Sequence, residues 1–394
     1  MTIKCLLPPI GSQTHIDSIC IGSGRFLRSV LVPALIAANL KPIIVQTRGR
    51  TFIDYLNESG TYNHNDDNDG SIPYWEYEVD TVEFNGDIST ERIPCYGAGS
   101  LGNSESKDEI MKLLENIASQ IKIIGVGVTE AGLTSCQTGA MKDLYSVLAC
   151  IRHHSKDRRF PISIVNTDNV PQNGALLSKF MMQIAESDED QNMIQFLKEF
   201  VVFHDTMVDR ITSQREGSKG MIPRAEPTPA KALVIEDLNQ SLPSELVKED
   251  IYKQYGVVVR TEKGKLDADI ALKLRIANGT HTAVAHVMAL KALLLTDELS
   301  KDTENAEILM AYLDSFFQQQ ILIGVEYASS FRGDAEEAKL VWEDWRKRLI
   351  HPYFGLSTFF ITQNGAAKGG IRIGPTIKDL LFNGKVCLKT IRNI

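Results

Sequence analysis

Short apolar runs alternate with helix-periodic segments through the first half of the chain. The runs indicate β-strands because they are brief, rich in Ile and Val, and bounded by turn-forming residues. Strands are expected at residues 16–21, 42–45, 77–84, 121–128, 162–165 and 200–203, and helices at 22–40, 107–120 and 139–154. Strands that alternate with helices predict an α/β fold in which crossover helices wind both faces of a parallel sheet.

The pattern changes its period in the second half of the chain. Two more short strands are expected at 232–235 and 256–260, before apolar residues recur at helical spacing over 268–296, 303–319 and 334–349. The sequence therefore predicts a doubly wound N-terminal domain over residues 1–262 and a mainly α-helical C-terminal domain over residues 263–394. A length of 394 residues suits two domains better than a single core.

Composition and charge narrow the classes of partner and the compartment. A net charge of −8 gives no basic stripe for a phosphate backbone, so nucleic acid is not an expected partner. The six cysteines contain no CxxC pair, and no apolar run approaches the ~20 residues that span a bilayer. We expect a cytoplasmic protein with free thiols and no membrane anchor, either a monomer or a dimer.

A glycine turn follows the first predicted strand and opens a helix. In this context two glycines let the backbone approach a pyrophosphate at the positive N-terminus of the helix. Leu27 stands where a third glycine is usual, and a GxG alone is also compatible with a merely structural turn. The strand and helix around it favour a Rossmann-like dinucleotide site. The residues expected at the cofactor are Gly22, Ser23, Gly24, Arg25 and Phe26.

The end of the second predicted strand leaves the choice of cofactor open. An acidic residue is expected there if the ribose hydroxyls of NAD are bound. The chain instead has Gln46, Thr47 and Arg48, with Arg50 close behind. The arginines could accommodate the 2′-phosphate of NADP, or they could simply be solvated. Both NAD and NADP remain candidates.

Polar residues follow three other predicted strands or motifs, at positions where an open α/β sheet collects its ligands. Any one such group is more often explained by turn chemistry, so the three are informative only together. They are Thr129-Glu130, Asp168-Asn169 and Val208-Asp209.

A lysine, an asparagine and a histidine share one apolar, helix-periodic segment, as Lys273, Asn278 and His281. In an ideal α-helix His281 lies about 80° and Asn278 about 140° around the axis from Lys273. A buried lysine can accept the proton of an alcohol, and an amide can donate to the alkoxide that forms. The competing interpretation is a solvated lysine, a core histidine and an Asn-Gly helix break.

Taken together, these segments resemble the long-chain polyol dehydrogenases and hexuronate reductases, the family of mannitol 2-dehydrogenase, fructuronate reductase and tagaturonate reductase. The Lys-x4-Asn-x2-His signature at residues 273–281 is the most specific match. The glycine turn and the three polar groups occur in the order that the family shows. Late in the chain, Gly365-Ala-Ala-Lys368 and Pro375-Thr-Ile377 are similar to two elements of the family's helical domain.

The resemblance implies a role for each matching residue and a reaction without a metal. Lys273 would be the general base, Asn169 and Asn278 donors to the alkoxide, and His281 a further residue of the catalytic group. Asp209 and Lys368 would bind the substrate, a polyol or a sugar acid. Arg48, Thr129, Glu130 and Val208 would join the glycine turn around NAD or NADP.

Two departures from the family leave alternatives open. Phe360 and Gln363 stand where mannitol 2-dehydrogenase has an arginine and a histidine that contact sugar hydroxyls, so mannitol itself is in doubt. Hexuronate reduction is the first alternative, with Arg275, Lys368 and Arg372 available for a carboxylate. A dinucleotide-binding protein without catalysis is an alternative of another class.

One further motif has the spacing of a calcium loop, in Asn65, Asp67, Asp69 and Gly70. Pro73 interrupts the expected helix, and Tyr74 to Val79 alternates like a strand. An acidic surface loop is the favoured interpretation.

Overall fold

The computed structural model describes residues 5–11, 15–59, 61–63, 72–128, 130–155, 158–301, 303–331 and 333–385. The chain divides into two compact units. The first comprises the described residues up to Val82 together with Ile88–Lys263, and the second comprises Glu83–Asp87 and the residues from Gly264 onward. The residues of the calcium-like motif lie outside the described residues, and so does Thr129.

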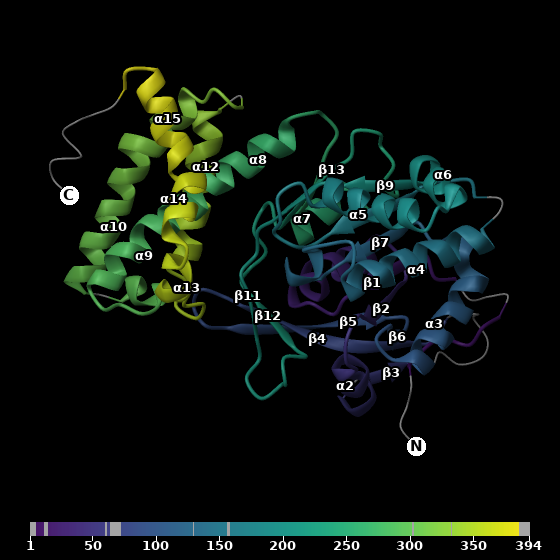
Figure 1. The fold of residues 1–394 in the computed structure, drawn as a ribbon. Helices are drawn as coiled ribbons and strands as arrows, with labels where there is room; N and C mark the ends of the chain where they lie inside the picture. The colour runs from purple at the N-terminus through teal and green to yellow at the C-terminus, as the bar shows by residue number, and fades with distance from the viewer. Residues whose placement is uncertain are drawn as a thin grey trace. The chain divides into compact units, whose positions relative to one another are not determined.

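A six-stranded parallel sheet forms the centre of the first unit (Figure 1). Its order is β6-β2-β1-β7-β8-β9, so the strand order reverses between β1 and β7. This is the order of a doubly wound dinucleotide-binding sheet, in which ligands collect beyond the carboxyl ends of the strands at the reversal. The strands are β1 Ser18–Ile21, β2 Pro42–Gln46, β6 Ala98–Ser100, β7 Ile123–Val126, β8 Ile162–Asn166 and β9 Val201–His204.

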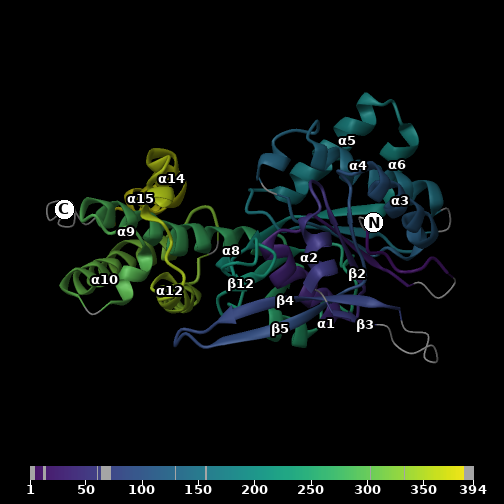
Figure 2. The same cartoon turned by 90° about the horizontal axis from the view of Figure 1, so that it is seen from below.

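Helices cover both faces of this sheet because its strands are apolar on both sides. On one face Ile19, Ile21 and Ile124 pack in a core with α3–α6, while on the other Cys20 and Ile44 pack with α1 and α2. Figure 2 shows the two groups on opposite sides of the sheet. The helices are α1 Val32–Ala37, α2 Thr51–Ser59, α3 Ser104–Ile117, α4 Gly139–His154, α5 Asn173–Ser187, α6 Gln191–Phe200 and α7 Glu249–Tyr255. The predicted doubly wound α/β fold is confirmed.

The predicted strand at residues 77–84 does not belong to the parallel sheet. Residues 74–82 form β4, which pairs antiparallel with β5 and β3 and parallel with β12 in a separate sheet. Its alternation of half-buried and buried positions is that of a sheet with only one buried face, which is why its sequence alternates. The remaining strands are β3 Thr61–Asn63, β5 Ile88–Cys95, β10 Thr206–Val208, β11 Thr212–Gln214, β12 Pro223–Ala225, β13 Leu233–Glu236 and β14 Val257–Arg260.

Strands β10, β13 and β14 form a third, three-stranded sheet. The late strands that were expected at 232–235 and 256–260 are thus present as β13 and β14, outside the parallel sheet. This small sheet carries Val208 at its edge strand β10.

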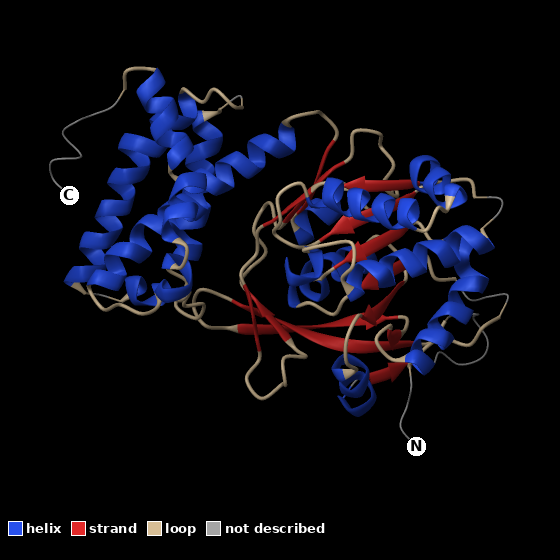
Figure 3. Ribbon diagram, viewed as in Figure 1, coloured by secondary structure: helices blue, strands red, loops and turns tan. Residues whose placement is uncertain are grey.

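The second unit consists of helices joined by loops (Figure 3), as the helical period of its sequence predicts. Its first helix runs through α8 and α9 with a π-helical turn between them, at Leu274–Asn278. The helices are α8 Lys265–Lys273, α9 Gly279–Leu290, α10 Glu304–Phe316, α11 Leu322–Glu326, α12 Ala335–Leu349, α13 Thr358–Thr362, α14 Gly365–Arg372 and α15 Gly374–Phe382.

One continuous helix of this unit, Glu304–Glu326, is long and apolar enough to cross a membrane by length and composition. It contains α10, a π-helical turn and α11, and polar residues such as Asp314 and Gln318 interrupt its apolar sequence. Within its apolar window, 44% of the segment is buried inside the protein. Leu313, Phe317 and Val325 lie on the buried side, so packing within the unit accounts for much of its apolar character.

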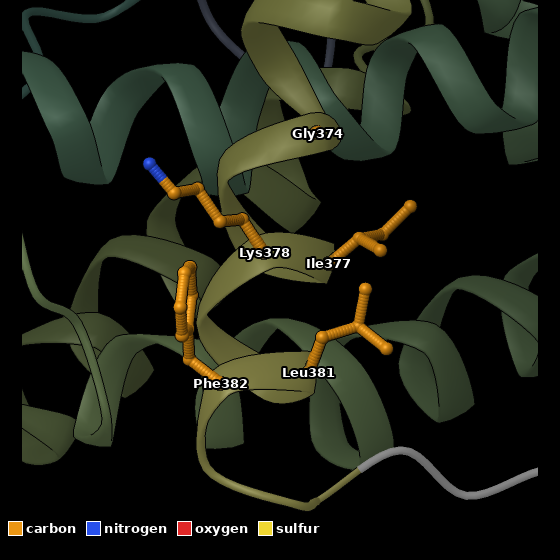
Figure 4. A pocket seen from close by; sticks show the side chains of 5 residues that line it. All are labelled: Gly374, Ile377, Lys378, Leu381 and Phe382. Atoms are coloured by element: carbon orange, nitrogen blue, oxygen red, sulfur yellow. The ribbon is translucent and has the colours of Figure 1, made fainter.

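The last described helix carries an apolar face that the unit leaves exposed. Ile377, Leu381 and Phe382 of α15 are 50%, 60% and 77% exposed. They line an open cavity of about 500 Å³ together with Gly374 and Lys378 (Figure 4). Packing inside the described unit therefore does not explain these residues.

Candidate active site

The glycine turn joins β1 to the helix that follows it, and its first glycine is structurally required. Gly22 has φ +101°, and a Cβ atom there would lie 2.1 Å from the carbonyl oxygen of Gly127. Its backbone N–H donates to the carbonyl of Val45 at 2.7 Å, which holds the turn against β2. Beyond it, Gly24 and Arg25 are exposed and Ser23 and Phe26 are half-buried. The turn thus presents backbone to solvent at the start of a helix, where an anion binds well.

The missing third glycine is replaced in space by glycines of the neighbouring strand. Leu27 is completely buried under the turn. A Cβ on Gly127 would lie 2.8 Å from Cβ of Leu27, and a Cβ on Gly125 would lie 2.7 Å from Cδ2 of Leu31. The helix and β7 approach closely because β7 supplies the small residues. Two glycines spaced by one residue, Gly125 in the strand and Gly127 directly after it, are the sequence signal for this approach.

The end of β2 is occupied by interactions within the protein. Gln46 is buried, and its side-chain oxygen accepts from the backbone N–H of Phe52 at 2.9 Å. The amide therefore supports the first turn of α2. Arg50 pairs with Asp54 at 2.9 Å, whereas Arg48 is exposed. Of the two arginines considered for a 2′-phosphate, Arg48 is the one that faces solvent.

Two carboxylates stand at the ends of adjacent strands β7 and β8. Glu130 is exposed at the start of a short helical turn, and Asp168 is half-buried two residues after β8. Burial raises the pKa of Asp168, and the charge of nearby Glu130 adds to the effect. One carboxylate oxygen of Asp168, Oδ2, is buried without a partner in the described part of the chain, whereas Oδ1 accepts from the N–H of Asn169 at 2.7 Å. Asn169 itself is exposed.

Asn173 ties this loop to the start of β10. Its Nδ2 donates to the Asp168 carbonyl at 2.9 Å and to Oγ1 of Thr206 at 2.8 Å, and its Oδ1 accepts from the Thr206 N–H at 2.9 Å. The polar groups after β8 and at β10 are therefore one connected structure. Val208 is buried, so at this position the side chain belongs to the core, and only its backbone can face a ligand. Asp209 is half-buried, and its N–H donates to Ala232 at 2.8 Å.

In the helical unit, the π-helical turn changes the angle around the helix axis that separates the predicted catalytic residues. The turn occupies Leu274–Asn278, directly after Lys273. In a π-helix residues five apart, rather than four apart, are hydrogen-bonded and lie over one another. Asn278 is therefore brought to the same side of the helix as Lys273, instead of the ~140° expected for an α-helix. Both side chains are half-buried.

His281 lies in α9, one turn beyond Asn278, with its ring packed against Trp345 at 5.8 Å in an edge-to-face arrangement. Its Nε2 is buried and has no hydrogen-bond partner among the described residues. Burial, together with the charges of Arg372 and Lys368, lowers the pKa of His281 to about 3. The imidazole is therefore neutral at physiological pH and holds an unused ring nitrogen.

Lys368 and Arg372 stand one turn apart on α14, which packs along α9. Lys368 Nζ donates to the carbonyls of Phe360 and Ile361 at 2.8 and 3.0 Å, and Arg372 donates to Thr282 Oγ1 at 2.8 Å. Burial and the charge of Arg372 lower the pKa of Lys368. The side chain of Phe360 is 66% exposed. Lys368 and Arg372 thus lie near His281, which is neutral, and the hydrogen-bond acceptors of both cations are neutral groups.

Arg275, the third cation considered for a substrate carboxylate, is occupied. It is buried and pairs with Asp379 of α15 at 2.7 Å, and it also donates to the Gly324 carbonyl at 3.1 Å. Its guanidinium lies 5.0 Å from the ring centre of Phe331. This residue supports the packing of the helical unit and does not meet the expectation of a free cation.

Two arginines that are not among the predicted site residues hold the glycine turn and the helix that follows it. Arg28 donates to the carbonyl of Ser23 in the turn, and Arg210 donates to the carbonyl of Ser29 in the following helix, both at 2.9 Å. Arg28 is buried without an acidic neighbour in sequence, so no local pattern distinguishes it from a solvated arginine. For Arg210, the only sequence signal of a role near the site is its position directly after Val208-Asp209.

Comparison with known proteins adds to this geometry. A family model described as the mannitol dehydrogenase Rossmann domain matches residues 17–240. Comparison with curated proteins gives no match. The structure is similar to D-sorbitol dehydrogenase in its substrate-free form, with TM-score 0.71 and 15% identity, over 96% of this chain and 79% of that chain. It is also similar to Pseudomonas fluorescens mannitol 2-dehydrogenase in its ternary complex with NAD and D-mannitol, with TM-score 0.65 and 16% identity, over 94% and 76% of the two chains.

Proposed function

Because the chain belongs to the mannitol dehydrogenase family, we propose that it is an NAD(P)-dependent oxidoreductase that interconverts a secondary alcohol and a ketone on a polyol or sugar acid. The family resemblance expected from the sequence is thereby confirmed, and with it an enzyme that acts on CH–OH groups. The substrate, the choice between NAD and NADP, and the roles of individual residues are parts of the proposal.

The glycine turn fits a dinucleotide. The space that a Cβ on Gly22 would occupy is filled by the backbone of Gly127, and the exposed backbone at Gly24 and Arg25 begins a helix. Gly22 to Phe26 would hold the pyrophosphate. Glu130, which follows β7, and the backbone of Val208, at the end of β10, would also contact the cofactor. A bound nicotinamide dinucleotide supplies the acceptor for the hydride of the alcohol, or its donor in the reverse direction.

The observation that carries the catalytic proposal is the π-helical turn, which puts Asn278 on the same side of the helix as Lys273. In oxidation Lys273 Nζ, in its neutral form, accepts the hydroxyl proton, and the amide of Asn278 donates to the oxygen as negative charge develops. In reduction the protonated lysine returns that proton. His281 is neutral and can accept from or donate to a substrate hydroxyl through Nε2, which has no hydrogen-bond partner in the part of the chain that the structure describes.

A substrate panel tests the proposal. The purified protein is expected to change the absorbance of the nicotinamide cofactor with at least one member of a set of polyols, ketoses and hexuronates, each with NAD and with NADP. Binding of reduced cofactor is measured separately by its fluorescence. Cofactor binding without turnover on any member would support the non-catalytic alternative, and absence of cofactor binding would reject the dinucleotide proposal itself.

One observation favours a sugar acid as the second candidate substrate. Lys368 and Arg372 lie near one another and near His281, and their described hydrogen bonds run to carbonyls and a hydroxyl, not to carboxylates. A site with two cations beside a buried neutral histidine would gain most from an anionic group. Hexuronate reduction is the reaction in this family that brings a carboxylate to such a group.

Replacing Arg372 by glutamine is therefore expected to lower kcat/KM for a hexuronate about tenfold or more, because a hydrogen bond to a charged group is lost. For a neutral polyol the change should be smaller than about threefold by the same reasoning. Steady-state kinetics with both substrates measure the difference. Arg346→Gln is the matched control, since Arg346 in the same unit pairs with Asp314 at 2.8 Å. Equal losses on both substrates would contradict a carboxylate subsite.

A further inference from the structure

Arg28 is the largest fully buried side chain in the described part of the chain. It lies in the π-helical turn that follows the glycine turn. Burial lowers the pKa of its guanidinium to about 10, so it still carries its charge at neutral pH. The described residues give it no ion pair with a carboxylate. Burying a charge of this kind costs free energy unless its N–H donors are hydrogen-bonded.

All the described donors of Arg28 point to backbone carbonyls. Nε donates to Ser23 in the glycine turn at 2.9 Å, one terminal nitrogen donates to Met221, and the other donates to Gly220 at 3.3 Å. The flat faces of the guanidinium are covered by Phe52 of α2, at 5.0 Å, and by Tyr77 of β4, at 5.9 Å. One side chain thus connects the turn with three segments far away in sequence.

The loop that receives two of these donors, residues 217–222, has a strained backbone. Gly217, Lys219 and Gly220 all have positive φ, of +73°, +51° and +79°. For Lys219 such a conformation costs of order 1 kcal/mol or more, so contacts outside the loop must maintain it. The loop also lines a cavity of about 510 Å³ with Thr51, Asp54 and Tyr55 of α2. Arg28 is therefore placed to fix the loop and the glycine turn relative to one another.

We propose that Arg28 is a positioning residue for the dinucleotide: it orients the Ser23 carbonyl, and with it the N–H groups of the glycine turn, by fastening the turn to loop 217–222. The residue does not touch the cofactor. It acts by keeping the turn in the conformation that binds a pyrophosphate, so its loss raises the free energy of the bound state. This inference rests on the proposed dinucleotide function of the turn.

The test compares two buried arginines of the same unit. Arg158 is also buried, also has its pKa lowered to about 10 by burial, and also donates to backbone carbonyls, those of Ala118, Ile121 and Phe160. Arg158 contacts the segment that precedes β7, at Ala118 and Ile121. This is the end of β7 that lies away from Gly127. Arg28→Met and Arg158→Met both remove a buried guanidinium, so both are expected to lower the melting temperature. Only Arg28→Met is expected to weaken binding of reduced cofactor, by about tenfold or more.

The measurement is the Kd of NADH or NADPH by fluorescence, well below the melting temperature of each variant, together with steady-state kinetics. For Arg28→Met the KM of the cofactor should rise by a similar factor, while kcat at saturating cofactor stays within about threefold. If Arg28→Met does not fold, Arg28→Lys replaces it, since lysine keeps the charge but cannot reach three carbonyls at once. A purely structural role predicts equal Kd values for the Arg28 and Arg158 variants and would overturn the inference. Wild-type protein without cofactor affinity would instead reject the proposed function.

Discussion

Replacing Lys273 by alanine is expected to reduce kcat for alcohol oxidation by about 10²-fold or more, since a general base contributes on this scale. The physical reason is that Lys273 is the proposed acceptor of the hydroxyl proton, whereas the amide of Asn278 can donate a hydrogen bond but is not basic. Lys273→Arg should be as inactive as the alanine variant, because a guanidinium stays protonated. Kinetics with saturating cofactor and substrate, over pH 6 to 10, measure both effects.

The pH profile distinguishes a base from a residue that merely binds. In the wild-type protein oxidation should speed up as rising pH removes the proton from the base, and reduction should slow down over the same interval. The pKa of His281, lowered to about 3, keeps that ring out of the titration. Lys265→Ala, an exposed lysine two turns earlier in the same helix, is the control and should leave the profile unchanged. A Lys273→Ala variant with most of the wild-type activity would remove the lysine from the mechanism.

Replacing Gly22 by alanine is expected to abolish measurable cofactor binding and to destabilise the protein by about 3 kcal/mol or more. The new Cβ would lie 2.1 Å from the carbonyl oxygen of Gly127, and backbone at φ +101° is unfavourable for any residue with a side chain. The turn can accept the methyl group only by moving away from β7, which displaces the N–H groups that would bind the pyrophosphate. Thermal unfolding and fluorescence titration with reduced cofactor measure the two losses.

Gly139→Ala is the matched control for this substitution. A Cβ at Gly139 meets nothing within 4 Å, and the residue begins α4, so alanine there should be neutral or slightly stabilising. If Gly22→Ala bound the cofactor with wild-type affinity, the turn between β1 and the following helix would not be the pyrophosphate site.

The fold was predictable to the extent that single elements carry their own hydrophobic pattern. Strands such as 162–166 are buried on both faces and appear in the sequence as continuous apolar runs. The third strand of the parallel sheet, β6, is Ala98-Gly-Ser100, whose residues carry no such run. The apolar pattern therefore predicts residues 77–84 as a strand of this sheet, although β4 pairs in another one. Pairing depends on contacts across the fold, which short apolar runs do not encode.

The candidate site was predictable where residues act through their own chemistry, as for Lys273 and the glycine turn. It was not predictable where they act through backbone geometry or distant partners. Neither the π-helical turn at Leu274–Asn278 nor the burial of Arg28 has a local sequence signal, because both depend on packing against other segments. The pairing of Arg275 with Asp379, 104 positions later, is a further case, and it removed one of three candidate carboxylate ligands.

The close approach of Leu27 and Gly127 makes the tolerance for mutation at one position depend on the residue at the other. With leucine at 27 the segment after β7 must keep glycine at 127, whereas a glycine at 27 would remove the two shortest contacts of a Cβ at 127 and leave Oγ1 of Thr167 at 3.2 Å. The two positions should therefore behave as an epistatic pair, across 100 residues of sequence. A sequence motif that counts glycines only in the turn includes position 27 but not position 127. Such a motif therefore misses dinucleotide sites in which a glycine opposite the turn provides the space.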